Sequence, residues 1–195
     1  MTTKNQDNLR EWNAEESGVF LGPVGSTLPS TSLVIPPEFI DSGWITDAGL
    51  EEGLTVETKE TKAWQAGKIV KIRNTSTKKT HKFASLEDDP AITGLYYGHD
   101  KPKLVTQNPP GPGKDIARVD MPTSVPTIER AAIFKLVDTA GYTRLKCVDR
   151  VSVSERGTYV TNVDGDPAYE FTLTETGEES YWLTDEPAFL EAAGA

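Results

Sequence analysis

Four oxygen-bearing side chains near the C-terminal end have a spacing that could bind a cation. Asn162, Asp164 and Asp166 alternate around Gly165, and Glu170 follows. Carboxylate and amide oxygens are the ligands that Ca²⁺ prefers, although the order here differs from that of the EF-hand loop. Asp-Gly-Asp-Pro is also ordinary turn chemistry between two strands. We therefore expect a turn here and leave calcium binding at Asp164 and Asp166 open.

The other catalytic patterns are incomplete. The segment PPGPGKD at 109–115 has the Gly-Lys pair of a phosphate-binding loop, but Asn108 stands where the first Gly is required. Asp115 follows the Lys, so the Ser or Thr hydroxyl that binds Mg²⁺ is missing. No Gly-x-Ser-x-Gly sequence is present to carry a nucleophilic serine. These patterns give no support for nucleotide hydrolysis or ester hydrolysis.

The histidines and the single cysteine do not have the spacing of a metal site. His81 and His99 are far apart in the sequence, and Cys147 has no second cysteine to pair with. Neither a zinc cluster nor an intrachain disulfide is therefore expected. The apolar neighbours Leu145 and Val148 predict a buried thiol at Cys147, and His81, in a basic run, is expected at the surface or at an interface. The sequence predicts no enzyme activity and no cofactor.

Composition favours a mainly β chain with long loops. Hydrophobic residues make up 36% of the chain, against a usual ~45–50%, and there are 13 prolines and 16 glycines. The start of the chain, MTTKNQDNLREW, has no apolar signal-peptide core. No run approaches the ~20 apolar residues that a membrane-spanning helix needs. We expect synthesis in the cytoplasm and no membrane anchoring.

Charge is distributed unevenly along the chain. The net charge is −10, yet residues 59–82 hold eight basic side chains and one acidic one. No Lys or Arg follows Arg156, whereas acidic residues continue to the end. Three interpretations remain open: solvated faces, a nucleic-acid patch, or basic and acidic surfaces that meet when copies stack head to tail. The basic run lacks the interleaved aromatic residues that would stack on bases.

The first 37 residues are expected to form an extended arm. Residues 8–16 could form a short helical turn, after which six Gly and Pro residues between 22 and 37 break regular structure. The arm carries two apolar groups, at 19–21 and at 33–35. These groups must pack either on the chain's own domain or on a neighbouring chain, and the sequence leaves both arrangements open.

Residues 38–184 are expected to form a β domain. Residues 54–59 alternate apolar and polar side chains, as a half-buried strand does. We expect a turn at 63–67, a strand at 68–73, a second turn at 74–78 and a strand at 79–86. Three acidic residues before Pro90 predict a short helix over 91–97 that ends at Gly98.

The second half of the domain follows a long loop. Residues 105–126 are rich in Pro and Gly and surround a short extended run at 116–121. Residues 128–138 and 142–148 flank Thr-Ala-Gly and predict a hairpin. Period-2 alternation predicts a strand at 169–174, and another strand is expected at 181–184. Residues 185–195 are expected to form a short C-terminal tail or helix.

Four segments of the first half carry a family resemblance. They are GPVGSTLPST at 22–31, FIDSGWITDAGL at 39–50, ETKAWQAG at 60–67 and GLYYG at 94–98. In order and spacing they resemble the major tail tube proteins of long, non-contractile-tailed bacteriophages, especially phages of actinobacteria. The resemblance covers roughly residues 20–185.

The resemblance implies a structural virion protein with a tail tube fold. That fold is mainly β, a β-sandwich or barrel-like domain with one short flanking helix, here 86–97, and an extended N-terminal arm and loops. Copies would form hexameric rings that stack into the tail tube, with strands around 54–73 and 128–148 lining a channel through which DNA passes without specific binding. The implied partners are the chain itself, the tape measure protein, the tail terminator and the tail-tip or distal tail proteins.

Two sets of residues take expected roles from this resemblance. Contacts between subunits are expected at Phe20, Val24, Leu28, Leu33 and Ile35 of the arm, and at Asn74, Thr75, Lys78 and Lys79 of the predicted turn. Glu57, Glu129 and Asp149 occupy polar positions of strands expected to line the channel. We expect these carboxylates to face the lumen and to repel phosphates over the ~8 Å that physiological salt leaves unscreened.

Two other functions fit parts of the same sequence. A tail terminator or head–tail connector of related fold would stop at a single ring. A β-sandwich that binds carbohydrate would use exposed aromatic residues, for which Trp44, Trp64, Tyr96, Tyr97 and Trp182 are available. The surroundings of these aromatic residues predict corners and core, which favours the tube subunit.

Overall fold

The computed structural model describes residues 9–64, 66–99, 101–105, 116–161 and 165–194. The fold is mainly β with antiparallel pairing, which confirms the expected class. The elements are β1 (Gly18–Gly22), β2 (Ile40–Asp41), β3 (Glu51–Lys62), β4 (Ile69–Ser85), α1 (Pro90–Tyr97), β5 (Lys103–Val105), β6 (Ile116–Arg118), β7 (Glu129–Val137), β8 (Thr143–Arg156), β9 (Tyr169–Glu175), β10 (Ser180–Thr184) and α2 (Pro187–Ala193).

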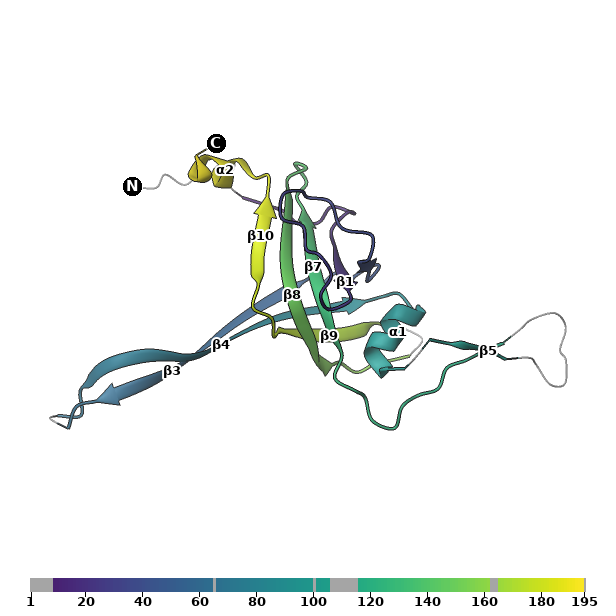
Figure 1. Cartoon of the computed structure of the whole chain (residues 1–195), viewed down its shortest axis with the longest axis horizontal. Helices are drawn as coiled ribbons and strands as arrows, with labels where there is room; N and C mark the ends of the chain where they lie inside the picture. Colours follow the sequence, from purple (N-terminus) through teal and green to yellow (C-terminus); the bar gives the residue numbers. More distant parts are fainter. Residues whose placement is uncertain (1–8, 65, 100, 106–115, 162–164, 195) are drawn as a thin grey trace.

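One sheet organises the molecule, in the order β2-β1-β7-β8-β9-β4-β3 (Figure 1). Strand β8 is long enough to pair with three neighbours: β7 along most of its length, β10 over Arg144–Val148 and β9 over Val151–Arg156. Strands β5 and β6 form a separate two-stranded ribbon. Because β8 changes its neighbour from β10 to β9 along its length, the sheet bends at this strand.

The bend brings strands that are not neighbours in the sheet face to face. The ring of His81 on β4 stacks on Phe134 of β7 at a centroid distance of 4.2 Å, although β8 and β9 lie between these strands in the sheet order. A core fills the space between the layers, where Phe83 and Phe171 pack together at 5.4 Å. Ile92 and Leu95 of α1 belong to the same core, so the helix flanks the sheet as expected.

The other face of β7 and β8 is also buried. Ile133, Leu145 and Cys147 alternate with the core residues of these strands and form a second cluster with Phe39. The segment before β2 covers this cluster, because Leu28, Leu33 and Ile35 pack against it. Burial raises the pKa of the Cys147 thiol to about 11, which fits the expected buried thiol and leaves it protonated at neutral pH.

The expected N-terminal arm requires correction. Residues 18–22 are strand β1, which pairs with β7 from Gly18↔Lys135 to Gly22↔Ala131. The predicted helical turn is absent from residues 9–16, where the backbone instead bonds to the end of β7: the Glu11 amide donates to Asp138 Oδ1 at 3.1 Å. An unpaired edge on β7 offered hydrogen bonds that a short isolated helix could not match.

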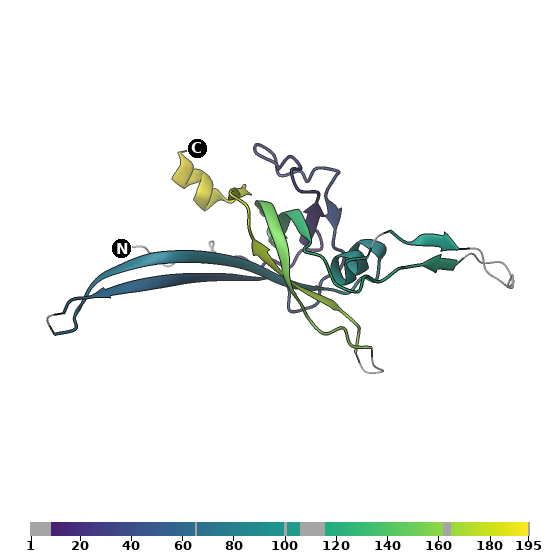
Figure 2. The same cartoon turned by 60° about the horizontal axis from the view of Figure 1, so that its bottom comes forward.

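The predicted turn at 74–78 is wrong, because β4 runs without a break from Ile69 to Ser85. The register shifts where Glu57 pairs with Ser76 and Thr58 pairs with Asn74, so Thr75 is the extra residue of a β-bulge. Its hydroxyl donates to the Glu57 carbonyl at 3.1 Å. Strands β3 and β4 therefore form one long hairpin that projects far from the body of the molecule (Figure 2).

The remaining elements largely follow the predictions. Helix α1 begins at Pro90 rather than at residue 86, and Gly98 ends it in a left-handed conformation with φ of 71°. The hairpin β7–β8 and the strands β9 and β10 form where expected, and residues 187–193 form helix α2. The PPGPGKD segment lies outside the described residues, as do Asn162 and Asp164 of the candidate calcium turn.

The start of α1 provides a test of this description. The Asp89 carboxylate accepts the backbone N–H groups of Ala91 and Ile92 at 2.6 and 2.9 Å. Replacing Asp89 with Ala removes this cap and should lower the free energy of unfolding by about 1 kcal/mol, measured by urea denaturation. Asp89→Asn retains a capping oxygen and should stay close to the wild type; equal losses in both variants would contradict the cap.

Candidate subunit interface

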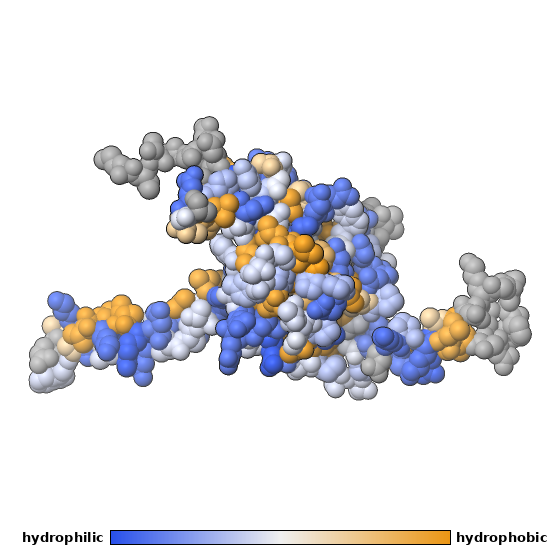
Figure 3. Space-filling model, turned by 45° about the horizontal axis from the view of Figure 1, so that its top comes forward, coloured by the Kyte–Doolittle hydropathy of each residue, from blue (hydrophilic) through white to orange (hydrophobic). Residues whose placement is uncertain are grey.

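The projecting hairpin has one apolar face and one basic face. Leu54 and Val56 alternate along β3, and Ile72 of β4 lies opposite Glu60 on the same side. Their exposed fractions are 65%, 42% and 60%. The opposite side pairs Lys59 with Arg73. Figure 3 shows hydrophobic residues gathered along this hairpin. A two-stranded ribbon of this kind is marginally stable alone in water, so the apolar face is a candidate for contact with a partner.

The hairpin ends in an exposed tryptophan. Trp64 is 96% exposed, and Ala66 and Gly67 follow it with φ of 59° and 61°. The Ala63 amide donates to the Lys68 carbonyl at 2.8 Å and closes the end of the ribbon. A large exposed aromatic side chain at the end of a projecting ribbon is typical of residues that dominate protein interfaces.

A buried ionic cluster joins the base of the hairpin to the body. Glu175 of β9 contacts His81 Nε2 at 2.8 Å and Lys146 Nζ at 3.1 Å, and the same Lys146 reaches Glu52 of β3. His81 is fully buried and Lys146 nearly so. The cluster therefore connects β3, β4, β8 and β9, and it fixes the direction in which the hairpin leaves the sheet.

The charges in this cluster compensate for the loss of water. Burial opposes ionisation of Glu175, but the hydrogen bond from His81 and the positive charges of Lys146 and Lys79 outweigh it and lower its pKa to about 2. The expectation that His81 lies at the surface is wrong. His81 alternates with Phe83 on the inward face of β4, so the same period that buries the phenylalanine buries the histidine.

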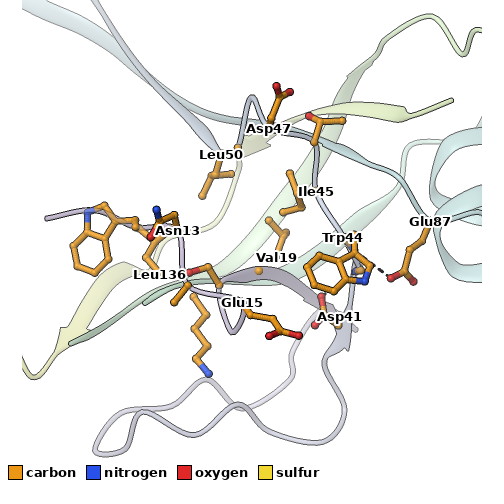
Figure 4. A pocket seen from close by; sticks show the side chains of 18 residues that line it. Asn13, Glu15, Val19, Asp41, Trp44, Ile45, Asp47, Leu50, Glu87 and Leu136 are labelled. Atoms are coloured by element: carbon orange, nitrogen blue, oxygen red, sulfur yellow. Dashed lines mark hydrogen bonds between the residues drawn. The ribbon is translucent and has the colours of Figure 1, made fainter. Parts of the chain in front are cut away.

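A cavity of about 530 Å³ opens beside the hairpin base, between the N-terminal segment and the β2–β3 connection. Val19, Ile45 and Leu50 provide an apolar floor (Figure 4). Four carboxylates surround this floor, those of Glu15, Asp41, Asp47 and Glu87. A second cavity, of about 760 Å³, lies beside α1, and its lining combines Lys101 and Arg130 with Asp41 and Glu129. The two cavities therefore differ in charge.

The apolar hairpin face, Trp64 and the two cavities are candidate surfaces for association. Among the described residues, no group of three or more His, Cys, Asp or Glu side chains could hold a metal ion. Asp166 is exposed, and Glu170 pairs with Lys82 at 2.7 Å. No helix within the described part of the chain is long and apolar enough to cross a membrane.

Comparison with known proteins identifies the kind of assembly. A family model described as "Phage tail tube protein" matches residues 2–191, which is nearly the whole chain. The chain belongs to the phage tail tube protein family. It is accordingly a structural component of a virion tail, as the resemblance of its sequence motifs implied.

The tail tube protein matches no curated protein sequence. Among solved structures it is similar to a chain described as the tail of an empty GTA particle computed with helical refinement and C6 symmetry. The two chains share 10% sequence identity with a TM-score of 0.47, and the match covers 88% of this chain and 98% of that one.

The predicted interface residues of the tail tube protein fall into two separate places. Phe20, Leu28, Leu33 and Ile35 pack against the chain's own second cluster, and Val24 is 41% exposed. Asn74, Thr75, Lys78 and Lys79 all lie on β4 within the hairpin. Lys79 contacts Glu175 at 3.5 Å and so also takes part in the buried cluster. Subunit contact at these positions stays a prediction.

The predicted lumen residues do not form one group. Glu57 lies on the hairpin and accepts a hydrogen bond from Ser76 at 2.8 Å, whereas Glu129 begins β7. Asp149 of β8 accepts the backbone N–H groups of Glu178 and Glu179, both at 3.2 Å, and thereby holds the turn before β10. A structural role for Asp149 is therefore visible within one subunit, and its position relative to a lumen stays a prediction.

The aromatic residues considered for carbohydrate binding are dispersed. Trp64 is at the hairpin end rather than in a core, and Trp182 packs on Arg144 at 4.6 Å. Tyr96 and Tyr97 are the last residues of α1 and pack against the core. They provide no shared platform for a sugar ring. The sequence predicted a corner at Trp64. It did not predict the length of the hairpin that exposes Trp64, because that length depends on β4 running without a break.

The ionic cluster predicts a specific acid sensitivity. Because the pKa of Glu175 falls from 4.5 to about 2 on folding, its ionisation stabilises the fold above pH ~4.5 by about 3 kcal/mol at most, and this contribution is lost as pH falls toward 2. Glu175→Gln should therefore unfold with a shallower pH dependence between pH 5 and pH 2, measured by urea denaturation at a series of pH values.

The matched control is Glu170→Gln, which removes a carboxylate from an exposed ion pair on the same strand. This control should retain the wild-type pH profile. A Glu175→Gln variant whose stability falls as steeply with acid as that of the wild type would contradict the role of the buried cluster.

Proposed function

We propose that this tail tube protein self-assembles into hexameric rings that stack into a tube through which DNA passes into the host. The observation that carries the proposal is the β3–β4 hairpin, whose apolar face has no partner within the described residues. Membership of the tail tube family supports the same assembly. The ring number and the stacking come from the resemblance of the sequence motifs.

Contact between copies would cover two exposed features of the hairpin at once: its unpaired strand edge and its apolar side chains. Within the described ranges of the chain, the outer edge of β3 is an unpaired row of backbone groups at the end of the sheet. The exposed residues Leu54, Val56 and Ile72 are apolar groups in water. A contact between different surfaces of successive copies closes into a ring or continues as a filament, depending on the rotation. A tube of stacked rings needs contacts that close each ring and contacts that continue from one ring to the next.

The proposal includes the environment of the protein. Synthesis takes place in the host cytoplasm, and the assembled protein resides in the virion tail. The tape measure protein, the tail terminator and the distal tail proteins are its further partners, and the protein has no enzyme activity. Val24, Asn74, Thr75 and Lys78 contact neighbouring subunits, and Glu57, Glu129 and Asp149 face the lumen.

Introducing charge into the apolar face of the hairpin tests the assembly directly. In Val56→Glu/Ile72→Glu two carboxylates enter the apolar face, so the variant should remain monomeric at concentrations where the wild type forms tubes in negative-stain electron microscopy. The control Thr55→Glu/Thr61→Glu adds the same charge to the opposite face and should retain tubes. Single rings of the wild type would support a connector, and a persistent monomer even with a tail-tip complex would contradict the proposal.

The lumen assignment has a separate test. Replacing Glu57, Glu129 and Asp149 with their amides together should slow DNA ejection from assembled virions, because phosphates near the wall would no longer be repelled. The comparison uses virions with equal tail lengths, so that assembly and conduction are measured apart. Unchanged ejection kinetics would show that these three side chains do not face the DNA.

A further inference from the structure

The smaller cavity, with its acidic rim, and the exposed Trp64 are complementary: one is a hollow with an apolar floor, and the other is a projecting aromatic ring among basic residues. The cavity offers an apolar floor of Val19, Ile45 and Leu50 within a rim of carboxylates. The hairpin end offers one large apolar ring, Trp64, between basic residues. An indole buries ~150–250 Å² of surface when it enters a pocket, and a volume of about 530 Å³ lies within the range of natural ligand sites.

Basic residues predominate around Trp64, and acidic residues predominate around the smaller cavity. Residues 59–73 carry Lys59, Lys62, Lys68, Lys71 and Arg73 against the single acidic residue Glu60. The cavity lining carries Glu15, Asp41, Asp47 and Glu87 against the single basic residue Lys135. The Glu87 carboxylate also accepts the Trp44 amide at 3.1 Å, and Asp41 accepts the Gly43 amide at 3.0 Å. These bonds hold two of the four carboxylates at the rim.

The same charges distinguish the two cavities. The larger cavity beside α1 has two basic side chains in its lining, Lys101 and Arg130, and two acidic ones, Asp41 and Glu129, so its charges balance. The smaller cavity attracts the basic hairpin end, because carboxylates outnumber basic groups in its lining. Size alone would favour the larger cavity, so the preference for the smaller one rests on electrostatic complementarity.

The hairpin of one chain cannot reach its own cavity. Leu50 lines the cavity and directly precedes β3, which then extends for 12 residues to Lys62. At ~3.3 Å per residue, the end of this strand lies about 40 Å from its beginning. Figure 1 shows the hairpin leading away from the body throughout this length. Any hairpin end that occupies the cavity therefore comes from a second copy.

We infer that Trp64 of one subunit inserts into the acidic cavity of another copy, with Lys62 and Lys68 placed against Asp47 and Glu15 at its rim. This contact deepens the proposed function and rests on it. It joins two different surfaces, so each subunit can give one hairpin and receive one. The distance between the cavity and the end of the hairpin then sets the spacing of successive copies at about 40 Å along the ribbon.

Cross-linking between two introduced cysteines tests the contact. Lys68→Cys/Asp47→Cys places one thiol beside Trp64 and one at the cavity rim. Oxidation of assembled tubes should produce a ladder of covalent multimers under denaturing, non-reducing conditions. The native Cys147 is fully buried and does not contribute. The control Lys68→Cys/Lys101→Cys places the second thiol at the other cavity and should give no ladder.

Substitution of the partners gives an independent measurement. Trp64→Ala should raise the protein concentration required for tubes at least tenfold, because the central aromatic contact is lost. Asp47→Lys should weaken assembly as well, and Lys68→Glu in the same chain should partly restore it. Trp64 and Lys68 are exposed in the monomer, so circular dichroism should show unchanged folding.

The outcomes separate the inference from the proposed function. Tubes of the Lys68→Cys/Asp47→Cys variant that give no ladder, or a ladder equal to that of the control pair, would overturn the cavity contact and leave tube formation intact. Tubes formed by Trp64→Ala at the same protein concentration as the wild type would do the same. A wild-type protein that never forms tubes would overturn the proposed function, and this inference with it.

Discussion

A carboxylate buried between two layers of sheet must be paired, and the pairing of Glu175 determines how the rest of the chain is arranged. His81 and Lys146 approach it from β4 and β8, and Lys146 also reaches Glu52 at the start of β3. Removing one partner from a buried ionic cluster of this kind usually destabilises a protein strongly. The four strands are thus held in one geometry, and the long hairpin leaves the body in a fixed direction.

That fixed direction matters because a two-stranded hairpin is only marginally stable in water without a partner. Its apolar residues are exposed, and the outer edge of β3 has no partner strand in the described part of the chain. An unpaired edge is a template for association, and proteins usually shorten or cover such edges. Here the edge is long, and the hairpin carries basic residues such as Lys59 and Arg73 on the face opposite the apolar one. The structure therefore combines a rigid body with a ribbon that is complete only in an assembly.

Much of this fold could be predicted from alternation in the sequence. The hairpin β7–β8, the strand β9 and the helix α1 follow from period-2 patterns and from Pro90 and Gly98. The turn predicted at 74–78 failed because Asn-Thr-Ser was interpreted as a turn, whereas β3 offered a partner and Thr75 entered a bulge. Strand β1 was missed because its pairing with β7 is a contact between residues distant in sequence.

The buried ionic cluster at the base of the hairpin was harder to predict from the sequence, again because it joins residues of separate strands. Glu175 continues the inward series of Tyr169, Phe171 and Leu173, and His81 continues that of Phe83, so the period itself placed both side chains inside. For His81 the surrounding basic run led to the opposite expectation, since charged residues are rarely buried unless they are paired. The partners come from separate strands, and only the folded arrangement shows that each charge has one.

Hydrogen–deuterium exchange of the hairpin amides, compared between monomer and tube, shows whether assembly completes the hairpin. We expect rapid exchange along the outer strand β3 in the monomer and strong protection in the tube, while β7 and β8 are protected in both. Equal exchange of β3 in the two states would contradict the claim that the hairpin is completed by assembly.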